Sequence, residues 1–301
     1  LDIADLSKEQ KPIDVSGIII DLQKDIDKNK KRGWVGFETG FMKLDEATGG
    51  LIPTQIWIVG AYTGTAKTFF LLQLLLNVVK KGAKVVLFST EMDRKWNMLR
   101  LLANISGIGV LRLLKGQIER EEVEDLEKAK EFLRKYKERL FIYDNVYTVN
   151  EIRLKAKKLK VKYGLDVIVL DYIQALKGTE NLFDRMSDAA TQLQQLAQEL
   201  DVTILIASQV SQSAAGWQSK EAIEYKGAGE IAAVADVGLW IKKSDSEKDI
   251  REIILRKVRH GIPQRFSARL TFPSGRMLDT ESTQQVLIKE DVSDGNVKDQ
   301  I

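Results

Sequence analysis

The feature that most constrains this chain lies near residue 60, where an apolar run, a loop of small residues and Lys-Thr follow one another. Residues 56–60 have the composition of a buried strand, and residues 61–66 form the loop. Lys67 and Thr68 then open a helical pattern of apolar residues through 71–78. Strand, glycine-bearing loop, Lys-Thr and helix is the layout of a phosphate-binding loop, whose backbone N–H groups cradle phosphate oxygens at a helix N-terminus.

The layout predicts a site for a nucleoside triphosphate with Mg²⁺. Lys67 is expected to reach the β- and γ-phosphates, and the Thr68 hydroxyl is expected to hold Mg²⁺. The residues expected to bind the nucleotide are Ala61, Tyr62, Thr63, Gly64, Thr65, Ala66, Lys67, Thr68 and Phe69.

Two alanines depart from the pattern G-x-x-x-x-G-K-[ST]. Ala61 holds the first glycine position and Ala66 the last. A residue with a side chain that is forced to positive φ costs roughly 1–2 kcal/mol. That cost weakens a phosphate site without abolishing it. The alternative at this point is an ordinary strand–loop–helix turn that contains Lys-Thr by chance.

The rest of the chain alternates strand-like and helical segments. Strand-like runs occur at 56–60, 84–89, 140–144, 166–171, 203–208 and 237–241. Their nearly continuous apolar composition is typical of parallel strands that helices cover on both faces. Residues 250–258 and 265–271 differ, because they flank the turn signals of residues 260–263 and predict a hairpin. The expected fold is therefore α/β, with a mostly parallel central sheet and a C-terminal β-hairpin.

Composition excludes some kinds of metal and catalytic site and bears on where the protein is located. The 301 residues include no cysteine and one histidine, which excludes disulfides and thiolate metal sites and argues against a histidine-based zinc site or a Ser-His-Asp triad. A net charge of +3 does not by itself indicate nucleic acid. No run of 18 apolar residues predicts a membrane span, and no signal-peptide pattern follows Leu1, so we expect a cytoplasmic protein without a membrane partner. A first residue other than Met suggests a fragment, and whether an N-terminal domain is missing stays open.

Three segments are expected along the chain. Residues 1–33 are an N-terminal segment with an amphipathic helix, whose apolar face includes Ile18, Leu22 and Ile26. This helix packs either on its own domain or on a neighbouring subunit. Residues 34–280 form the main domain, and the acidic residues 281–301 form a disordered tail.

Three polar residues stand where predicted strands end, at the edge where parallel sheets bind ligands. Asp171 ends the run 166–171 and could hold Mg²⁺. Glu91 follows the run 84–89 and could polarise a water that attacks the γ-phosphate, or it could cap a helix. Gln209 follows the run 203–208 and could sense phosphate hydrolysis.

Two later segments carry basic residues. Residues 210–230 form a long loop rich in Ser, Gln, Ala and Gly, which is either functional or simply disordered. Within it, four residues could contact a phosphate backbone: Lys220, Lys226, Gly227 and Gly229. Lys257 and Arg259 are expected on one face of a strand, where they could neutralise a transition-state phosphate supplied by another subunit. The alternative for this pair is a solvated charged strand, and His260 is interpreted as a turn residue.

Taken together, these motifs form a recognisable series. They are the residues 40–45, the phosphate-binding loop, and the residues 88–92, 170–174, 207–209, 235–237 and 256–261. In this order and spacing, residues 33–280 resemble the C-terminal, RecA-like motor domain of DnaB-type replicative helicases.

The resemblance implies a fold and a set of roles. The fold is a RecA-like P-loop NTPase with an N-terminal linker helix that docks on the next subunit of a ring. ATP with Mg²⁺ is the cofactor; Lys67 and Thr68 bind phosphate and metal, and Asp171 is the Walker B acid. Glu91 is the catalytic base and Gln209 the sensor. Arg259 is the arginine finger beside Lys257, and Lys226, Gly227 and Gly229 lie in the loop that grips single-stranded DNA. The implied assembly is a homohexameric ring, with a helicase loader or primase as further partners.

The sequence departs from the family pattern at Ala66, at Tyr62 in place of a common Arg, and at Gly227 in place of a frequent Glu. The family's N-terminal collar domain, which meets primase, is absent from the sequence. Two alternatives stay open: a RecA- or KaiC-like DNA-dependent ATPase that does not unwind DNA, and a catalytically weak ring that serves as a DNA-binding scaffold.

Overall fold

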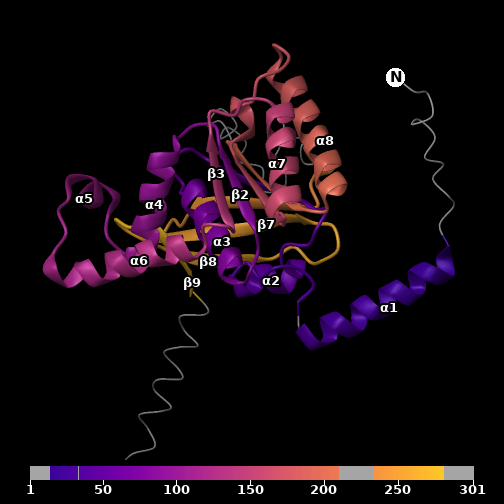
Figure 1. Cartoon of the computed structure of the whole chain (residues 1–301), viewed down its shortest axis with the longest axis horizontal. Helices are drawn as coiled ribbons and strands as arrows, with labels where there is room; N and C mark the ends of the chain where they lie inside the picture. Colours follow the sequence, from indigo (N-terminus) through magenta and orange to yellow (C-terminus); the bar gives the residue numbers. More distant parts are fainter. Residues whose placement is uncertain (1–13, 33, 210–232, 281–301) are drawn as a thin grey trace, which may run out of the picture. The chain divides into compact units, whose positions relative to one another are not determined.

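The computed structural model describes residues 14–32, 34–209 and 233–280 (Figure 1). The chain divides into two units, Leu1–Val35 and Gly36–Ile301, which are described separately below. The predicted disordered tail at 281–301 and most of the basic loop at 210–230 lie outside the described residues.

In the first unit the described residues form a helix, α1 (Val15–Arg32). It confirms the predicted amphipathic helix and begins at Val15, because Asp14 accepts a hydrogen bond from the N–H of Ser16 at the helix start. Its apolar side chains are exposed, among them Ile19 at 60% and Leu22 at 54%. Which surface covers them stays a prediction.

The described part of the second unit is built on a nine-stranded sheet with the order β3-β2-β4-β5-β1-β6-β7-β8-β9. Its strands are β1 (Ile56–Ala61), β2 (Val85–Ser89), β3 (Leu140–Asp144), β4 (Val167–Asp171), β5 (Thr203–Gln209), β6 (Val237–Lys243), β7 (Ile250–Val258), β8 (Arg265–Thr271) and β9 (Arg276–Asp279). The strands β1–β6 pair in parallel, and β7, β8 and β9 continue the sheet antiparallel. The predicted mostly parallel sheet with a C-terminal hairpin is confirmed.

The register of the central strands brings the predicted site residues to one edge. Ala61 at the end of β1 pairs with Gln209 at the end of β5, and Ser89 at the end of β2 pairs with Asp171 at the end of β4. Because parallel strands all point the same way, their carboxyl ends form a single crevice. The loop after β1, the residues after β2 and the ends of β4 and β5 therefore meet there.

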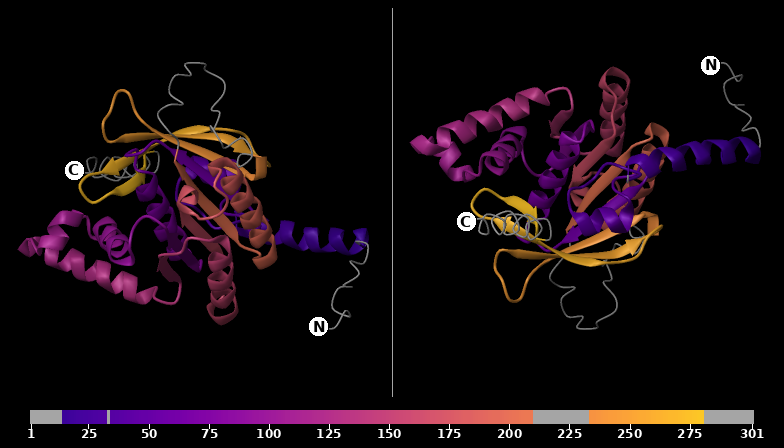
Figure 2. Two further views of the ribbon diagram at one scale, coloured as in Figure 1. Left: turned by 90° about the horizontal axis from the view of Figure 1, so that it is seen from above. Right: turned by 90° about the horizontal axis from the view of Figure 1, so that it is seen from below.

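Helices cover both faces of the sheet (Figures 1 and 2). One face packs against α2 (Met42–Thr48), α3 (Lys67–Lys80) and α4 (Arg94–Ser106), and the other against α7 (Val149–Tyr163) and α8 (Leu182–Leu200). Alternate residues of β1 show the division, because Trp57 and Val59 belong to the first core and Ile56 and Ile58 to the second. Burial on both faces explains the continuous apolar runs in the sequence.

The remaining described helices lie outside these two layers. The helices α5 (Val110–Lys115) and α6 (Val123–Lys135), with the short 3₁₀ turn η2 (Arg120–Glu122), lie beside α4 (Figure 2). A second 3₁₀ turn, η3 (Ile173–Ala175), follows β4 directly.

The motif at residues 40–45 has a structural explanation. The carboxylate of Asp45 accepts hydrogen bonds from the N–H groups of Thr39 and Gly40, at 2.7 and 3.1 Å. Burial raises the pKa of Asp45 to about 6, although these hydrogen bonds oppose the shift. The amide of Asn77 on α3 donates to the carbonyl of Thr39. Asp45 and Asn77 thus fix the segment that leads into the domain against the helix of the phosphate-binding loop.

The sequence did not predict β9, a four-residue strand after the turn that follows β8. Its alternation of polar and apolar residues is too short to stand out, and long-range contacts stabilise it instead. The side chain of Gln73 on α3 accepts a hydrogen bond from the N–H of Met277, and Asp279 accepts one from the N–H of Met42.

Candidate nucleotide-binding site

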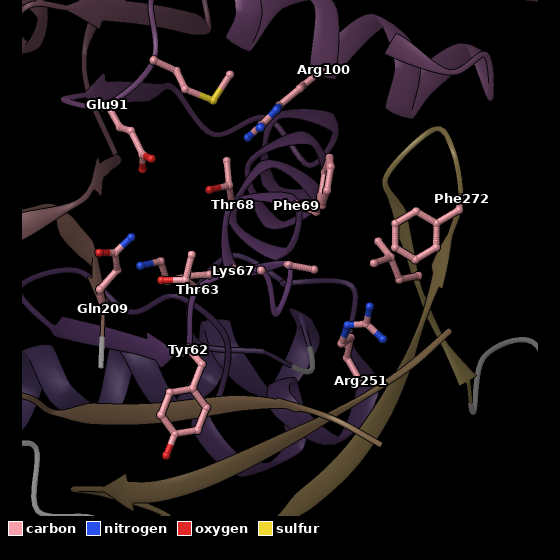
Figure 3. A pocket seen from close by; sticks show the side chains of 14 residues that line it. Tyr62, Thr63, Lys67, Thr68, Phe69, Glu91, Arg100, Gln209, Arg251 and Phe272 are labelled. Carbon is pink, nitrogen blue, oxygen red and sulfur yellow. The ribbon is translucent and has the colours of Figure 1, made fainter. Parts of the chain in front are cut away.

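A pocket of about 220 Å³ opens where the loop after β1 meets the ends of β2 and β5 (Figure 3). Its lining includes nine of the residues predicted from the sequence: Tyr62, Thr63, Gly64, Ala66, Lys67, Thr68, Phe69, Glu91 and Gln209. Ala61 at the end of β1 and Thr65 in the loop are both buried. Glu91 and Gln209 lie on one side of Lys67, and Arg251 and Phe272 lie on the other (Figure 3).

The loop between β1 and α3 has the backbone conformation of an anion cradle. Gly64 has φ 74°, and a Cβ built on it would meet no atom within 4 Å. The N–H and the hydroxyl of Thr65 both donate to the carbonyl of Tyr62, which closes the turn. Ala66 then adopts φ 82° and ψ 25° immediately before the first residue of α3. The sequence therefore places an alanine where the backbone adopts the left-handed conformation that glycine favours.

We expect Ala66→Gly to raise the free energy of unfolding by roughly 1 kcal/mol, because relief of the left-handed strain outweighs the greater flexibility of glycine in the unfolded chain. Urea denaturation without nucleotide measures the change. Any nucleotide hydrolysis should stay equal or increase. Ala47→Gly on α2 is the matched control and should lower stability, because the helix interior does not require glycine. A less stable Ala66→Gly protein would contradict this explanation.

Three polar side chains meet at the start of α3. The hydroxyl of Thr68 donates a hydrogen bond of 2.8 Å to Oδ2 of Asp171. Oδ1 of the same carboxylate is buried and has no hydrogen-bond partner in the part of the chain that the structure describes, and the same holds for the buried Nζ of Lys67. Both residues are less than a tenth exposed. An orphaned ammonium and an orphaned carboxylate oxygen around one threonine hydroxyl are donor and acceptor groups prepared for a ligand.

The electrostatics of these groups follow from burial. Burial lowers the pKa of Lys67, while the carboxylates of Asp171 and Glu91 oppose that shift. Burial likewise raises the pKa of Asp171, against the effects of Lys67, Thr68 and Arg100. Phosphate oxygens beside Lys67 and a divalent cation beside Asp171 would each favour the charged form of these side chains. The residues present therefore fit a nucleoside triphosphate and Mg²⁺.

Glu91 lies in the segment between β2 and α4 and lines the pocket. It does not cap α4, because the side chain of Asp93 takes that role by accepting a hydrogen bond from the N–H of Trp96. The preceding residue, Thr90, exchanges hydrogen bonds with the backbone of Asp171 and Tyr172. The carboxylate of Glu91 is thus carried by a segment tied to the strand that presents Asp171.

Gln209 is the last residue of β5 and extends into the pocket (Figure 3). The side chain of Gln174, in η3, accepts from the N–H of Gln209 and donates to its carbonyl and to the hydroxyl of Ser208. These hydrogen bonds hold the backbone at the end of β5 in place. The side chain of Gln209 faces the loop that precedes Lys67.

Sequence reasoning missed two arginines in the lining. Arg100 on α4 lies with its guanidinium 5.2 Å from the ring centre of Phe69, and burial lowers its pKa against the carboxylates of Asp171 and Glu91. Arg251 on β7 is 2% exposed. The signal that could have found them is a charged residue in an otherwise apolar helix face or strand. Leu270, Phe272 and Met92 complete the lining.

Lys257 and Arg259 lie away from this pocket. Arg259 follows the end of β7 in a turn, as does His260, and its guanidinium pairs with Asp236 at 2.9 Å. The other oxygen of Asp236 accepts from the N–H of Ile56 at the start of β1. Lys257 donates to the carbonyl of Ala233, and burial and the charge of Arg259 lower its pKa. The pair therefore belongs to the edge of the sheet opposite the phosphate-binding loop.

Some predicted site residues fall outside the described chain, namely Lys220, Lys226, Gly227 and Gly229. Within residues 14–32, 34–209 and 233–280, no cluster of three or more His, Cys, Asp or Glu side chains could hold a metal alone. In the same residues, no helix has the length and apolar character needed to cross a membrane.

Comparisons with known proteins agree with this geometry. A family model described as "DnaB-like helicase C terminal domain" matches residues 36–275. "Replicative DNA helicase DnaB" of Geobacillus stearothermophilus is 32% identical over 240 residues, covering 75% of this chain and 52% of that protein. "Replicative DNA helicase DnaC" of Bacillus subtilis (strain 168) is 30% identical over 247 residues, covering 77% and 54%. The chain spans about half the length of the curated relatives it matches.

A solved structure described as "ATPase Domain of G40P" superimposes with a TM-score of 0.82 at 24% identity, covering 89% of this chain and 99% of that chain. A second, "The Structure Of A DnaB-Like Replicative Helicase And Its Interactions With Primase", gives a TM-score of 0.78 at 23% identity. These likenesses confirm the RecA-like fold predicted from the sequence. The chain belongs to the DnaB-like helicase C-terminal domain family.

Proposed function

We propose that this member of the DnaB-like helicase family is the ATP-hydrolysing motor of a replicative DNA helicase, which moves along single-stranded DNA as a hexameric ring. The observation that carries the proposal is a pair of buried groups near the start of α3, Lys67 Nζ and Asp171 Oδ1, which have no hydrogen-bond partner among the described residues. Such groups persist in a folded chain where a ligand completes them.

In the proposed site the triphosphate lies in the loop of residues 61–66, with Lys67 donating to its β- and γ-phosphates. Thr68 and Asp171 hold Mg²⁺, which when bound offsets negative charge on the β- and γ-oxygens. Arg100, whose guanidinium faces the same carboxylates as Lys67, adds positive charge near the phosphates.

Hydrolysis requires a water aligned with the γ-phosphorus. We assign its orientation to Glu91, which accepts a proton as the water oxygen bonds to phosphorus and the bond to the β–γ bridging oxygen breaks. The products are ADP and phosphate. Gln209 lines the same pocket and directly precedes residues 210–230, so it would report hydrolysis to that segment.

The DNA and assembly parts of the proposal rest on the family and on the sequence. Lys220, Lys226, Gly227 and Gly229 would contact the DNA backbone through charge and closely approaching N–H groups. Residues 1–33 would link neighbouring subunits, which agrees with the exposed apolar side chains of α1. Residues 34–280 would be the motor and 281–301 a tail. A loader or primase would be a further partner, and the cytoplasm the location.

A single experiment tests the motor function. We expect ATP hydrolysis that single-stranded DNA stimulates, together with ATP-dependent displacement of a strand from a forked duplex. Hydrolysis without displacement would favour the RecA- or KaiC-like alternative, and the absence of hydrolysis would favour a DNA-binding scaffold.

The DNA loop has its own expected result. Lys226→Ala should weaken single-stranded DNA binding similarly for all sequences, and should reduce the slope of log affinity against log salt by roughly 0.7. DNA-stimulated hydrolysis should fall more than basal hydrolysis. Titration of a labelled oligonucleotide at several salt concentrations measures this, with the exposed Lys137→Ala as a control. Unchanged affinity and slope in both Lys220→Ala and Lys226→Ala would show that charge in this loop does not grip DNA.

A further inference from the structure

Arg251 is a charged side chain of the pocket to which neither the motifs nor the mechanism above gives a role. It is the second residue of β7 and only 2% exposed. Its Nε donates a hydrogen bond of 3.1 Å to the carbonyl of Thr65 in the phosphate-binding loop. Its Nη1 donates to the carbonyls of Lys248 and Ile250, at 2.8 and 2.9 Å.

In the described residues, the hydrogen bonds of the guanidinium all go to backbone carbonyls. Among the described residues, no carboxylate forms an ion pair with Arg251, since the neighbouring Asp249 pairs with Arg269 on β8. Burial lowers the pKa of Arg251, and the charge of Asp249 only opposes that effect from a distance. A buried cation without a paired anion is costly to the folded chain. We therefore look for the function of this buried charge in its contact with the phosphate-binding loop.

The contact to Thr65 fixes one particular peptide plane. The carbonyl of Thr65 and the N–H of Ala66 belong to the same planar trans peptide and point in opposite directions. Arg251 holds the carbonyl toward β7, so the N–H of Ala66 points away from β7. That same Ala66 has φ 82°, a conformation that a residue with a side chain leaves readily unless its surroundings hold it.

We propose that Arg251 is a positioning residue of the nucleotide site, which holds the Thr65–Ala66 peptide in the orientation that phosphate binding requires and so compensates for the missing glycine. This inference rests on the proposed ATP-binding function. Without Arg251, Ala66 relaxes toward negative φ, and nucleotide binding has to restore the strained conformation. With glycine at position 66, the left-handed conformation is freely available and Arg251 becomes dispensable for binding.

The expected effects follow from the strain at Ala66. Arg251→Met, which keeps the buried aliphatic stem, should weaken binding of a non-hydrolysable ATP analogue with Mg²⁺ by about 5- to 30-fold. KM for ATP should rise to a similar extent, while kcat at saturating ATP should change by less than about 3-fold. In the Ala66→Gly background, the same substitution should weaken binding by less than about 3-fold.

The test compares four proteins: the parent, Arg251→Met, Ala66→Gly and the double variant. Analogue affinity is measured by titration, and thermal unfolding without nucleotide shows that each protein folds. Arg251→Gln takes the place of the methionine variant where the latter does not fold. Arg265→Met, which removes an exposed arginine of the neighbouring strand β8, should leave affinity unchanged.

The outcomes separate the explanations. A loss that is large in the parent background and small in the Ala66→Gly background supports the inference. Equal losses in both backgrounds would overturn it, because a general structural role or direct contact with the nucleotide does not depend on residue 66. No loss in either background would also overturn it. Failure of the parent and of Ala66→Gly to bind the analogue would contradict the ATP-binding function itself.

Discussion

Lys67→Met is expected to lower steady-state ATP hydrolysis by roughly 100- to 1,000-fold, the range observed when one charge-stabilising donor is removed from a reacting oxyanion. The reason is the position of Nζ, which is buried near Asp171 and, among the described residues, has no hydrogen-bond partner. In the proposed site, its removal would take a positive charge away from the phosphates as negative charge develops on them.

The same substitution should not destabilise the protein. Burial lowers the pKa of Lys67, so the protonated form is less favoured in the folded chain than in the unfolded chain. Below the folded-state pKa, folding therefore carries a penalty for burying the charge, which methionine removes. Thermal unfolding without nucleotide should show an equal or higher midpoint, whereas the increase in midpoint that an ATP analogue gives the parent should be lost.

Two companion variants complete this test. Lys81→Met, directly after α3, removes a largely exposed lysine and should keep the parent's rate and its response to nucleotide. Glu91→Gln should keep analogue binding but lose hydrolysis, since it alters only the group assigned to the attacking water. If both Lys67→Met and Glu91→Gln hydrolysed ATP at the parent rate, the site assignment would be wrong.

The central fold and much of this pocket could be predicted because their signals are local. A buried parallel strand is a short apolar run, and a phosphate-binding loop is contiguous with the strand before it and the helix after it. Once the strands are taken as parallel, Glu91, Asp171 and Gln209 meet at one edge without any knowledge of side-chain packing. The structure confirms this strand arrangement, with the end of β5 beside the end of β1.

The residues that could not be predicted depend on contacts between distant segments. Arg100 reaches the pocket because α4 packs beside α3, and Arg251 because β7 continues the sheet past β6. A charged residue within an apolar segment is the signal that the sequence offers for each, and it does not say which pocket the side chain reaches. The strand β9 is similar, since the side chain of Gln73 on α3, which accepts a hydrogen bond from the N–H of Met277, lies about 200 positions earlier in the chain.

Arg259→Ala should reduce ATP hydrolysis by at least roughly 1,000-fold if Arg259 acts as an arginine finger. Arg259 lies too far from the phosphate-binding loop of its own chain to contact phosphates bound there. Asp236 ties it to Ile56 at the start of β1, whereas the phosphate-binding loop begins after Ala61 at the other end of that strand. The strand spans about 17 Å at 3.3 Å per residue, well beyond the reach of an arginine side chain. A catalytic role for Arg259 therefore requires the nucleotide of a second copy.

Mixing two inactive proteins tests this requirement. Arg259→Ala subunits keep an intact phosphate-binding loop, and Lys67→Met subunits keep the finger, so mixed assemblies contain complete sites at some interfaces. Partial recovery of hydrolysis is expected over a range of mixing ratios. A mixture of Lys67→Met with the double variant Lys67→Met, Arg259→Ala is the control, because no pairing in it supplies both groups, and it should stay inactive.

The ion pair itself supplies the competing explanation, in which Arg259 only anchors Asp236. The side chain of Arg259 is 44% exposed, and Asp236 keeps its hydrogen bond from the N–H of Ile56, so the loss of the pair should lower the free energy of unfolding by about 1 kcal/mol. A structural role thus predicts a small loss of stability and a small loss of rate that mixing cannot restore. An active Arg259→Ala protein, or mixed assemblies that form and stay inactive at every ratio, would count against a finger acting between subunits. If Arg259→Ala is stable and inactive, and mixing with Lys67→Met restores ATP hydrolysis, the arginine that acts at each site must come from a neighbouring copy.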